Sequence, residues 1–192
     1  MNEYAALALQ IAAGIGLAAC AGLRAFLPLL VTGAAARLGW INLADNFDWL
    51  SSWPALIIFG VAAVTEVLGD KLPVVDHALD LLQSFLKPAA GAVLVAAVVT
   101  DLTPLQSAVL GILAGGSAAG AFHLTKAKLR LASTVFSGGL ANPLISLAED
   151  GLTLAGTFLS LVVPLIMLAC LAGTILFVAF LLLLRGRQVA RE

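Results

Sequence analysis

The sequence has few charged residues, few aromatic residues, and only two cysteines and two histidines. Charged residues make up 11% of the 192 positions, against about 25% in ordinary soluble domains. So few charges cannot cover the surface of a soluble domain of this size. A formal net charge of −1 gives no basic face for nucleic acid, and two cysteines do not make a disulfide scaffold. These shortages exclude a soluble domain, a nucleic-acid-binding protein and a disulfide-rich protein.

What the sequence has instead is apolar residues. Hydrophobic residues make up 61% of the chain, and its mean hydropathy is +1.08. Such a chain has lipid as the solvent for most of its length, and only helices or closed barrels satisfy their backbone groups there. We therefore predict an all-α fold, a polytopic bundle of transmembrane helices forming one integral membrane domain over residues 1–192.

The apolar residues fall into seven runs, each a candidate membrane crossing. The runs are 4–22, 25–39, 54–70, 88–100, 105–122, 131–147 and 152–184. Three of them, 25–39, 88–100 and 131–147, are short or interrupted, and each either crosses fully or is re-entrant. About seven crossings are expected, with four full spans plus broken pieces as the alternative. Between the third and fourth runs, residues 75–87 have the pattern of an amphipathic helix in the membrane interface.

The basic residues predict an orientation, because Lys and Arg in short loops prefer the cytoplasmic side. With about seven crossings and the C-terminus inside, a basic loop at 123–130 and every other basic residue except Arg37 become cytoplasmic. We therefore expect a multi-pass protein of the bacterial inner membrane, with the N-terminus outside and the C-terminus in the cytoplasm. This count also gives residues 4–71 and 104–185 the same orientation, as in a three-plus-one-plus-three internal repeat.

A dense acidic group lies at the end of the third run and just after it. Glu66 and Asp70 are four residues apart and share a helical face, and Asp76, His77 and Asp80 come soon after. A carboxylate at hydrocarbon depth is costly and needs a partner or a function. We interpret Glu66 and Asp70 as ion- or solute-binding residues. The group 76, 77 and 80 is either a divalent-metal site or a solvated interfacial helix.

A second polar group interrupts the run at 131–147. Asn142 precedes a proline, so a helix is expected to begin there with its free N–H groups pointing into the protein. Ser146, Glu149 and Asp150 follow on the same helix. These four residues are interpreted as part of a binding site, together with Arg24 from the end of the first run. The alternative is a helix cap and an exposed acidic turn.

A third group is basic. His123, Lys126 and Arg130 follow the fifth run, and Lys126 and Arg130 share a helical face. With Arg24 they could hold an anionic group or neutralise the carboxylates. The sequence has no phosphate-binding loop, nucleotide fingerprint or haem and zinc pattern, so no cofactor is expected.

Glycine and alanine recur at spacings of four, as in the pairs Ala18 and Gly22, and Gly116 and Gly120. Such small-residue faces bring helices close together, within the chain or in a homodimer.

These residues also carry a family resemblance, over nearly the whole chain. The sequence resembles a family of small bacterial integral-membrane proteins that is known only as a domain of unknown function. The resemblance implies a polytopic membrane protein and supplies no activity. The residues that carry it are Gly22-Leu-Arg24-Ala-Phe-Leu-Pro28, Glu66, Asp70-Lys71, Pro73, Asp76-His77, Asp80, the stretch 126–130, Ser133-Thr134, Asn142-Pro143, Ser146 and Glu149-Asp150.

Buried carboxylates beside broken helices favour a transporter or permease for an ion or a small polar solute, with the bilayer as its other partner. One alternative is a metal-dependent membrane enzyme acting on lipid-linked phosphates. The other is a non-catalytic assembly or lipid-handling subunit. Transport is expected ahead of catalysis.

Overall fold

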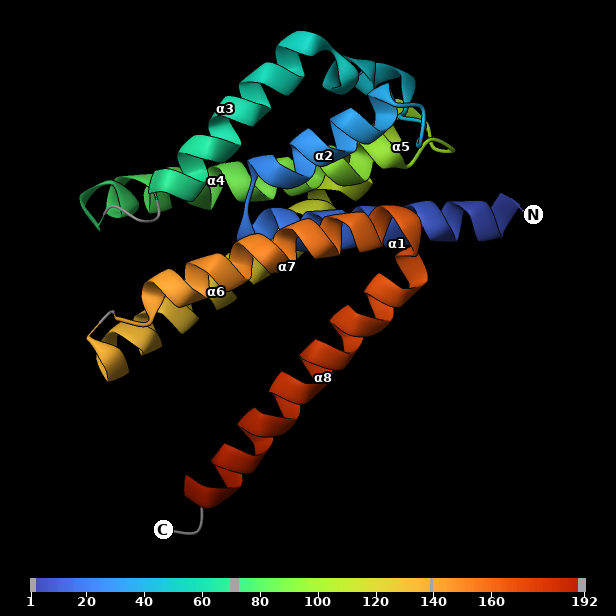
Figure 1. The fold of residues 1–192 in the computed structure, drawn as a ribbon. Helices are drawn as coiled ribbons and strands as arrows, with labels where there is room; N and C mark the ends of the chain where they lie inside the picture. The colour runs from blue at the N-terminus through green and yellow to red at the C-terminus, as the bar shows by residue number, and fades with distance from the viewer. Residues whose placement is uncertain (1–2, 70–72, 139, 190–192) are drawn as a thin grey trace.

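The protein is a bundle of helices (Figure 1). This computed structural model describes the backbone of residues 3–69, 73–138 and 140–189, and the side chains of 3–69, 82–138 and 140–177. The described residues contain no strand, so the all-α class is confirmed. In chain order the helices are α1 (Glu3–Leu23), α2 (Phe26–Arg37), the 3₁₀ helix η1 (Asp45–Ser51), α3 (Trp53–Gly69), α4 (Pro73–Val98), α5 (Pro104–Leu110), the π-helix η2 (Gly111–Gly116), α6 (Ser117–Ser137), α7 (Asn142–Val162) and α8 (Pro164–Val189).

Successive helices run back and forth in opposite directions (Figure 1). The segments α5, η2 and α6 follow one another without a break and form one long rod, 104–137. The chain turns between α7 and α8, and α8 then leads away from the bundle (Figure 1). The result is a bundle with two ends, each built from several chain turns.

Three helical segments of the described residues are long and apolar enough to cross a membrane: Glu3–Leu23, Pro104–Ser137 and Asn142–Val162. A fourth is formed by η1 and α3 if that pair, bent by 61°, counts as one span. The helices α2 and part of α4 and α8 are apolar but shorter. The fold is therefore compatible with a membrane location, and the count of about seven crossings stays a prediction.

Helix α1 lies at the centre and packs against α4, α6, α7 and α8. Its apolar face, including Leu17 and Ala21, meets Leu94 and Val95 of α4 in the core. Large apolar side chains such as Ile58 on α3 and Leu113 on η2 point outward and are exposed. This arrangement, with an apolar core and an apolar surface, suits a lipid environment.

Small residues allow the helices to approach closely. A Cβ added at Gly22 would collide with the Ala119 carbonyl of α6, and one at Gly115 with the Gly91 carbonyl of α4. Gly116 and Gly120 also face α4, at Pro88. The predicted small-residue faces therefore pack helices within this chain, and the homodimer expected through them remains a prediction.

The run 152–184 is divided between α7 and α8 at Val163, and two further expected boundaries also differ from the structure. The interfacial helix predicted over 75–87 and the run 88–100 form one continuous helix, α4, with Pro88 inside it. The basic loop predicted at 123–130 is wrong, because these residues continue α6. Packing against α1 stabilises both helical stretches. The ion pairs of Lys126 and Arg130 with Glu149 of α7 also stabilise the second one.

Two expected helix starts are correct. Helix α2 begins at Phe26 and has Pro28 in its first turn, where proline is tolerated. Helix α7 begins at Asn142 with proline in its first turn, after a turn in which Gly138 has a left-handed φ of 61°. The run 131–147 is thus two helices joined by a turn.

Candidate functional site

The candidate site is built around the break between α1 and α2. A helix N-terminus has free N–H groups and a partial positive charge, which need an acceptor away from water. The carboxylate of Glu66, on α3, supplies it. Glu66 Oε1 accepts the Ala25 N–H at 3.0 Å, and Oε2 accepts the Phe26 N–H at 3.3 Å. A side chain 41 positions away thus caps the N-terminus of α2.

A cation faces the other side of the same break. Leu23 is the last residue of α1, and its carbonyl accepts a hydrogen bond from Lys126 Nζ at 3.3 Å. Helix C-termini carry a partial negative charge that favours such a cation. The break therefore has an anion at the new N-terminus and a cation at the preceding C-terminus, each delivered by a different helix.

Arg24 lies in the break itself and is completely buried. Its Nε is 2.7 Å from Asp150 Oδ1 in an ion pair. Its NH1 donates to the Glu66 carbonyl at 3.2 Å, and its NH2 donates to Ser146 Oγ at 2.9 Å. The planar guanidinium thus joins α3 to α7 through separate nitrogen atoms, a geometry that a lysine cannot reproduce.

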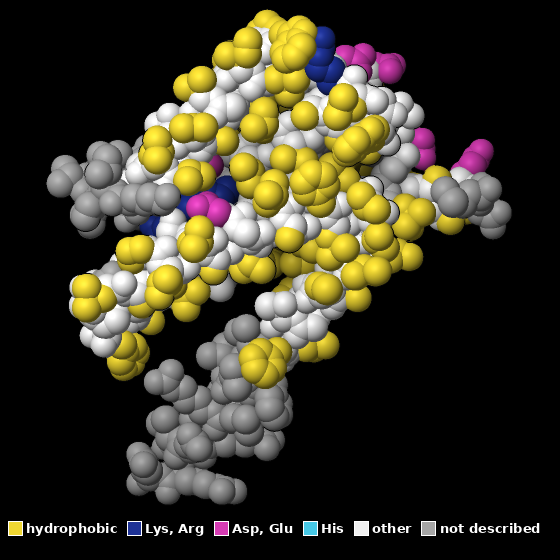
Figure 2. Space-filling view, in the orientation of Figure 1, with side chains coloured by type: hydrophobic (Ala, Val, Ile, Leu, Met, Phe, Trp, Pro, Cys, Tyr) yellow, Lys and Arg dark blue, Asp and Glu magenta, His cyan; other side chains and the backbone are white. Residues whose placement is uncertain are grey.

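Glu149 is the second buried carboxylate. Its Oε2 is 3.0 Å from Lys126 Nζ and 3.4 Å from Arg130 NH2, so one oxygen atom serves two cations of α6. All three side chains are largely buried. Buried charges are costly unless paired, and this pairing supplies the compensation. We call Arg24, Glu66, Lys126, Arg130, Ser146, Glu149 and Asp150 the charged cluster. Figure 2 shows acidic and basic side chains meeting at one place on a largely apolar face.

A further polar group extends the charged cluster along α6. Lys87 of α4, which is fully buried, lies 3.3 Å from His123 Nδ1, and Ser84 Oγ lies 3.2 Å from Nε2. The two imidazole nitrogens of His123 thus each face one polar side chain of α4, and which nitrogen donates depends on the tautomer.

Helix α7 carries a buried polar face that begins at the charged cluster. After Glu149 in α7, fully buried polar residues recur at helical spacing: Thr153, Thr157 and Ser160. Each hydroxyl donates to a carbonyl one turn earlier in α7. Ser160 lies next to Gly16 of α1. The polar face therefore runs along the interior of the bundle rather than toward the surrounding solvent.

The structure brings together most of the predicted site residues whose side chains it describes. Arg24, Glu66, Ser146, Glu149 and Asp150 meet Lys126 and Arg130 in the charged cluster, and His123 lies one turn away on α6. Asn142 is placed differently, because its Nδ2 donates to Thr134 of α6 at 3.2 Å and holds the α6–α7 turn.

Apart from Glu66, the predicted acidic group lies outside the described side chains. Asp70 is not described at all. Asp76, His77 and Asp80 lie in the helical backbone of α4, but their side chains are not described. Among the described residues, no three His, Cys, Asp or Glu side chains are close enough to share a metal ion.

Sequence reasoning missed two parts of this region. The sequence pattern puts Lys87 at the end of the predicted interfacial helix, before Pro88, and predicts no burial for it. The polar face of α7 is the second part, because no site role was predicted for Thr153, Thr157 and Ser160. Their helical spacing from Glu149 is a signal in the sequence that could have indicated this face. Both lie on faces that only the packing of α4, α6 and α7 turns inward.

The fold and the charged cluster define a class of protein: an all-α bundle of apolar helices, several able to span a membrane, with buried charges at a helix break. Within that class, the chain belongs to the family described as Domain of unknown function (DUF4126), which it matches over residues 11–185. The family resemblance of the sequence is thereby confirmed. Comparison with curated proteins and with solved structures gives no match.

Proposed function

We propose that the protein is a membrane transporter of the permease type, which moves an ion or a small polar solute through the charged cluster. The observation that carries this proposal is the meeting of buried charges from α3, α6 and α7 with Arg24 at the α1–α2 break. Buried ionisable residues in membrane helices are rare and commonly mark a solute or ion pathway. Broken helices at such a site are a recurring design of transporters.

The chemistry of the charged cluster supports binding of a charged or polar solute. Glu149 holds both Lys126 and Arg130 through one oxygen atom. A charged solute would replace one partner of this internal ion pair. The new contact would offset the free-energy cost of taking the solute out of water. Because the partners lie on α6 and α7, such an exchange would loosen the contact between two helices and couple binding to movement.

The polar face of α7 supports a route through the bundle. From Glu149 to Ser160 it extends about 16 Å at 1.5 Å per residue. In the structure, the hydroxyl groups of Thr153, Thr157 and Ser160 donate hydrogen bonds to backbone carbonyls of α7. They can turn toward a passing solute without leaving a charge unpaired, because the helix keeps its own backbone bonds.

For the membrane arrangement, we propose about seven crossings in the bacterial inner membrane, with the N-terminus outside and the C-terminus cytoplasmic. The opposite directions of successive helices support this count and the parallel repeat (Figure 1). The turns between α2 and α3 and between α4 and α5 lie at the N-terminal end of α1 and include the exposed acids Asp48 and Asp101, while α6, which carries exposed Lys128, leads toward the other end (Figure 1). We include Asp70, four residues after Glu66 in the sequence, in the proposed site.

The test is flux into liposomes containing the purified protein, with a panel of protons, Na⁺, K⁺, Mg²⁺, phosphate and neutral amino acids. We expect wild-type flux of at least one member above that of empty liposomes. Glu66→Gln and Glu149→Gln should lower it at least tenfold, the effect of about 1.4 kcal/mol on a barrier. Thr157→Val should lower it as well.

Matched controls separate transport from folding. Asp101→Asn removes an exposed carboxylate outside the charged cluster, and Thr65→Val removes an exposed threonine with the same bond to its own helix as Thr157. Both should transport like wild type. The proposal is overturned if wild type moves no panel member, or if well-folded Glu66→Gln and Glu149→Gln transport normally, in which case the ion pairs only hold helices together.

A further inference from the structure

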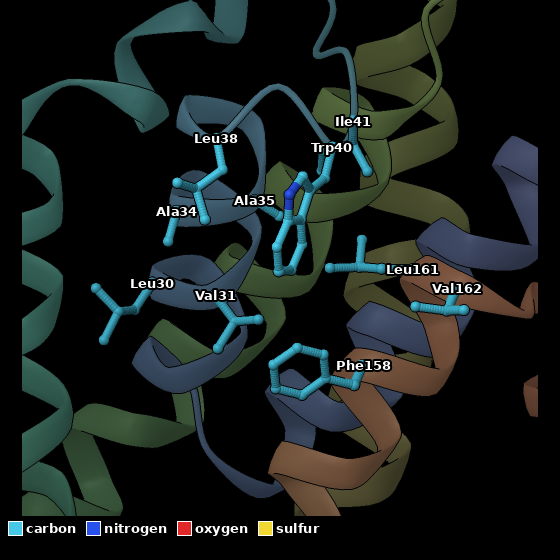
Figure 3. Close-up of a pocket in the computed structure, with 10 residues that line it drawn as sticks. All are labelled: Leu30, Val31, Ala34, Ala35, Leu38, Trp40, Ile41, Phe158, Leu161 and Val162. Atoms are coloured by element: carbon cyan, nitrogen blue, oxygen red, sulfur yellow. The ribbon is translucent and has the colours of Figure 1, made fainter.

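An apolar cavity of about 590 Å³ lies between α2 and α7, away from the charged cluster. Figure 3 shows its wall: Leu30 to Ala35 of α2 and Leu38 just after that helix on one side, Phe158 to Val162 at the end of α7 on the other, and Trp40 across one end. All of its lining residues are apolar or aromatic. The volume is within the usual range of small-molecule sites, about 300–1,000 Å³.

A second cavity, of about 320 Å³, shares Trp40, Ile41 and Leu161 with the first. It differs in being partly polar, because Gln10, Asn42 and Thr100 also line it. Gln10 Nε2 donates to Thr100 Oγ1 at 2.9 Å, and the Thr100 N–H donates to Gln10 Oε1 at 3.0 Å, so this polar wall is fixed. We call the first cavity the apolar chamber and the second, partly polar cavity the polar chamber. The two chambers meet at one shared wall.

This pair of chambers has the dimensions of part of a lipid molecule. From Leu30 on α2 to Leu38 just after it, the apolar chamber extends about 12 Å at 1.5 Å per residue. One leaflet of a bilayer has a hydrocarbon depth of about 15 Å. Trp40, Trp49 and Trp53 are exposed at the same end of the bundle, as in the aromatic belt at a membrane surface. The apolar chamber thus runs from headgroup level into the depth of an acyl chain.

The exposed charges at the tryptophan end of the bundle favour one kind of lipid headgroup. Exposed acids there include Glu3, Asp45, Asp48 and Asp101, and Thr100 Oγ1 donates to Asp101 Oδ1 at 3.3 Å, which places that carboxylate beside the polar chamber. Arg37, an exposed cation of this end, stacks on Trp53 at 4.2 Å and donates to the Ser51 carbonyl. The resulting field repels a purely anionic headgroup and attracts an amine.

We propose that these two chambers form a binding site for one aminophospholipid of the surrounding bilayer, distinct from the transport site. One acyl chain lies between α2 and α7, and the primary amine of the headgroup lies near Asp101. The amide of Asn42, and the second N–H of the Gln10 amide that does not bond to Thr100, offer donors to the phosphate. The proposal stands on the cavities and their charges, so it does not depend on whether the charged cluster transports a solute.

The experiment is native mass spectrometry of the full protein in detergent, titrated with phosphatidylethanolamine or phosphatidylglycerol of the same acyl chains. Wild type should bind one phosphatidylethanolamine at least tenfold more tightly than phosphatidylglycerol, about 1.4 kcal/mol. Ala34→Trp, which fills the apolar chamber, should lose this binding. Ile58→Trp, on the exposed face of α3, should keep it.

A charge reversal tests the headgroup chemistry separately. Asp101→Lys should abolish the preference for phosphatidylethanolamine, while Lys128→Glu, a reversal at an exposed position of α6, should retain it. In wild type, a phosphatidylethanolamine with a photoreactive acyl chain should label residues in the ranges 30–41 and 158–162. Equal binding of both lipids by wild type, or labelling confined to α3 and α8, would overturn the proposal whether or not Ala34→Trp folds.

Discussion

The carboxylate of Glu66 accepts the backbone N–H of Ala25 at 3.0 Å across 41 positions of sequence. This contact makes the N-terminus of α2 dependent on α3. It also leaves the broken helix pair α1–α2 without an unsatisfied N–H at Ala25 or Phe26. The break, which would be costly in a membrane on its own, is stable because another helix supplies the anion that it needs.

The first prediction concerns this cap. Glu66→Gln keeps the shape of the side chain but replaces a carboxylate that accepts two N–H groups with an amide that has one acceptor atom. We expect a loss of about 1–2 kcal/mol of stability, measured by thermal unfolding in detergent. Glu3→Gln, at an exposed position of α1, is the control and should unfold like wild type. Equal midpoints for both variants would show that the cap contributes nothing.

The second prediction concerns Arg24. Its Nε, NH1 and NH2 each contact a different group. Arg24→Lys keeps the charge but cannot make these three separate contacts, because lysine has one nitrogen atom. We expect Arg24→Lys to destabilise the protein by about 2–4 kcal/mol, nearly as much as Arg24→Met. Arg37→Lys, at an exposed arginine that stacks on Trp53, should cost less than about 1 kcal/mol. Near-normal stability of Arg24→Lys would mean that charge alone is needed.

The third prediction concerns the pair Lys126 and Glu149. Stability measurements on Lys126→Met, Glu149→Gln and the double variant give their coupling free energy. We expect about 1–3 kcal/mol, because the two groups are buried and 3.0 Å apart. Lys128→Met with Glu149→Gln is the matched control, since Lys128 is exposed and two residues away. Its coupling should be near zero, and an equal value for both pairs would contradict a direct contact.

The fourth prediction concerns helix approach. Gly115→Ala places a Cβ against the Gly91 carbonyl, and backbone cannot move aside easily. We expect a loss of about 1–3 kcal/mol. Gly60→Ala, where no atom lies within 4 Å of the added Cβ, should be neutral or stabilising by up to about 1 kcal/mol. If both substitutions behave alike in thermal unfolding, the close α4–η2 contact is not required.

The fifth prediction concerns the proposed orientation. After replacement of Cys20 and Cys170 by alanine, single cysteines at positions 48, 101 and 128 report sidedness. A membrane-impermeant thiol reagent added to intact cells should label Asp48→Cys and Asp101→Cys. It should reach Lys128→Cys only after the membrane is permeabilised. Labelling of all three from one side would contradict the crossing count and the orientation.

The sequence predicted helix starts well where the signal was local. Asn142 with the proline that follows marks the beginning of α7, and Pro28 falls in the first turn of α2, because proline fits only the first turn of a helix without loss of a hydrogen bond. The same rule failed at Pro88, which lies inside α4. There, packing of α4 against α1 outweighs the cost of one missing bond.

The basic residues show a second limit of local reasoning. Lys126 and Arg130 were predicted in a cytoplasmic loop, and the structure has them buried in α6 beside Glu149. A basic residue followed by apolar residues is typical both of a cytoplasmic loop and of a helix buried in a bundle. The difference depends on whether a carboxylate from elsewhere in the chain arrives within bonding distance, which no periodicity reveals.

Composition and hydropathy alone determined that the chain is helical, that lipid suits most of its surface, and that its few charges need partners, because each follows from the cost of leaving polar groups in hydrocarbon. Tertiary structure alone decided the partners. Arg24 meets Ser146 across 122 positions, and Glu66 reaches Ala25 across 41. Such pairings depend on how whole helices pack, and Coulomb attraction acts only once that packing has brought the charges together.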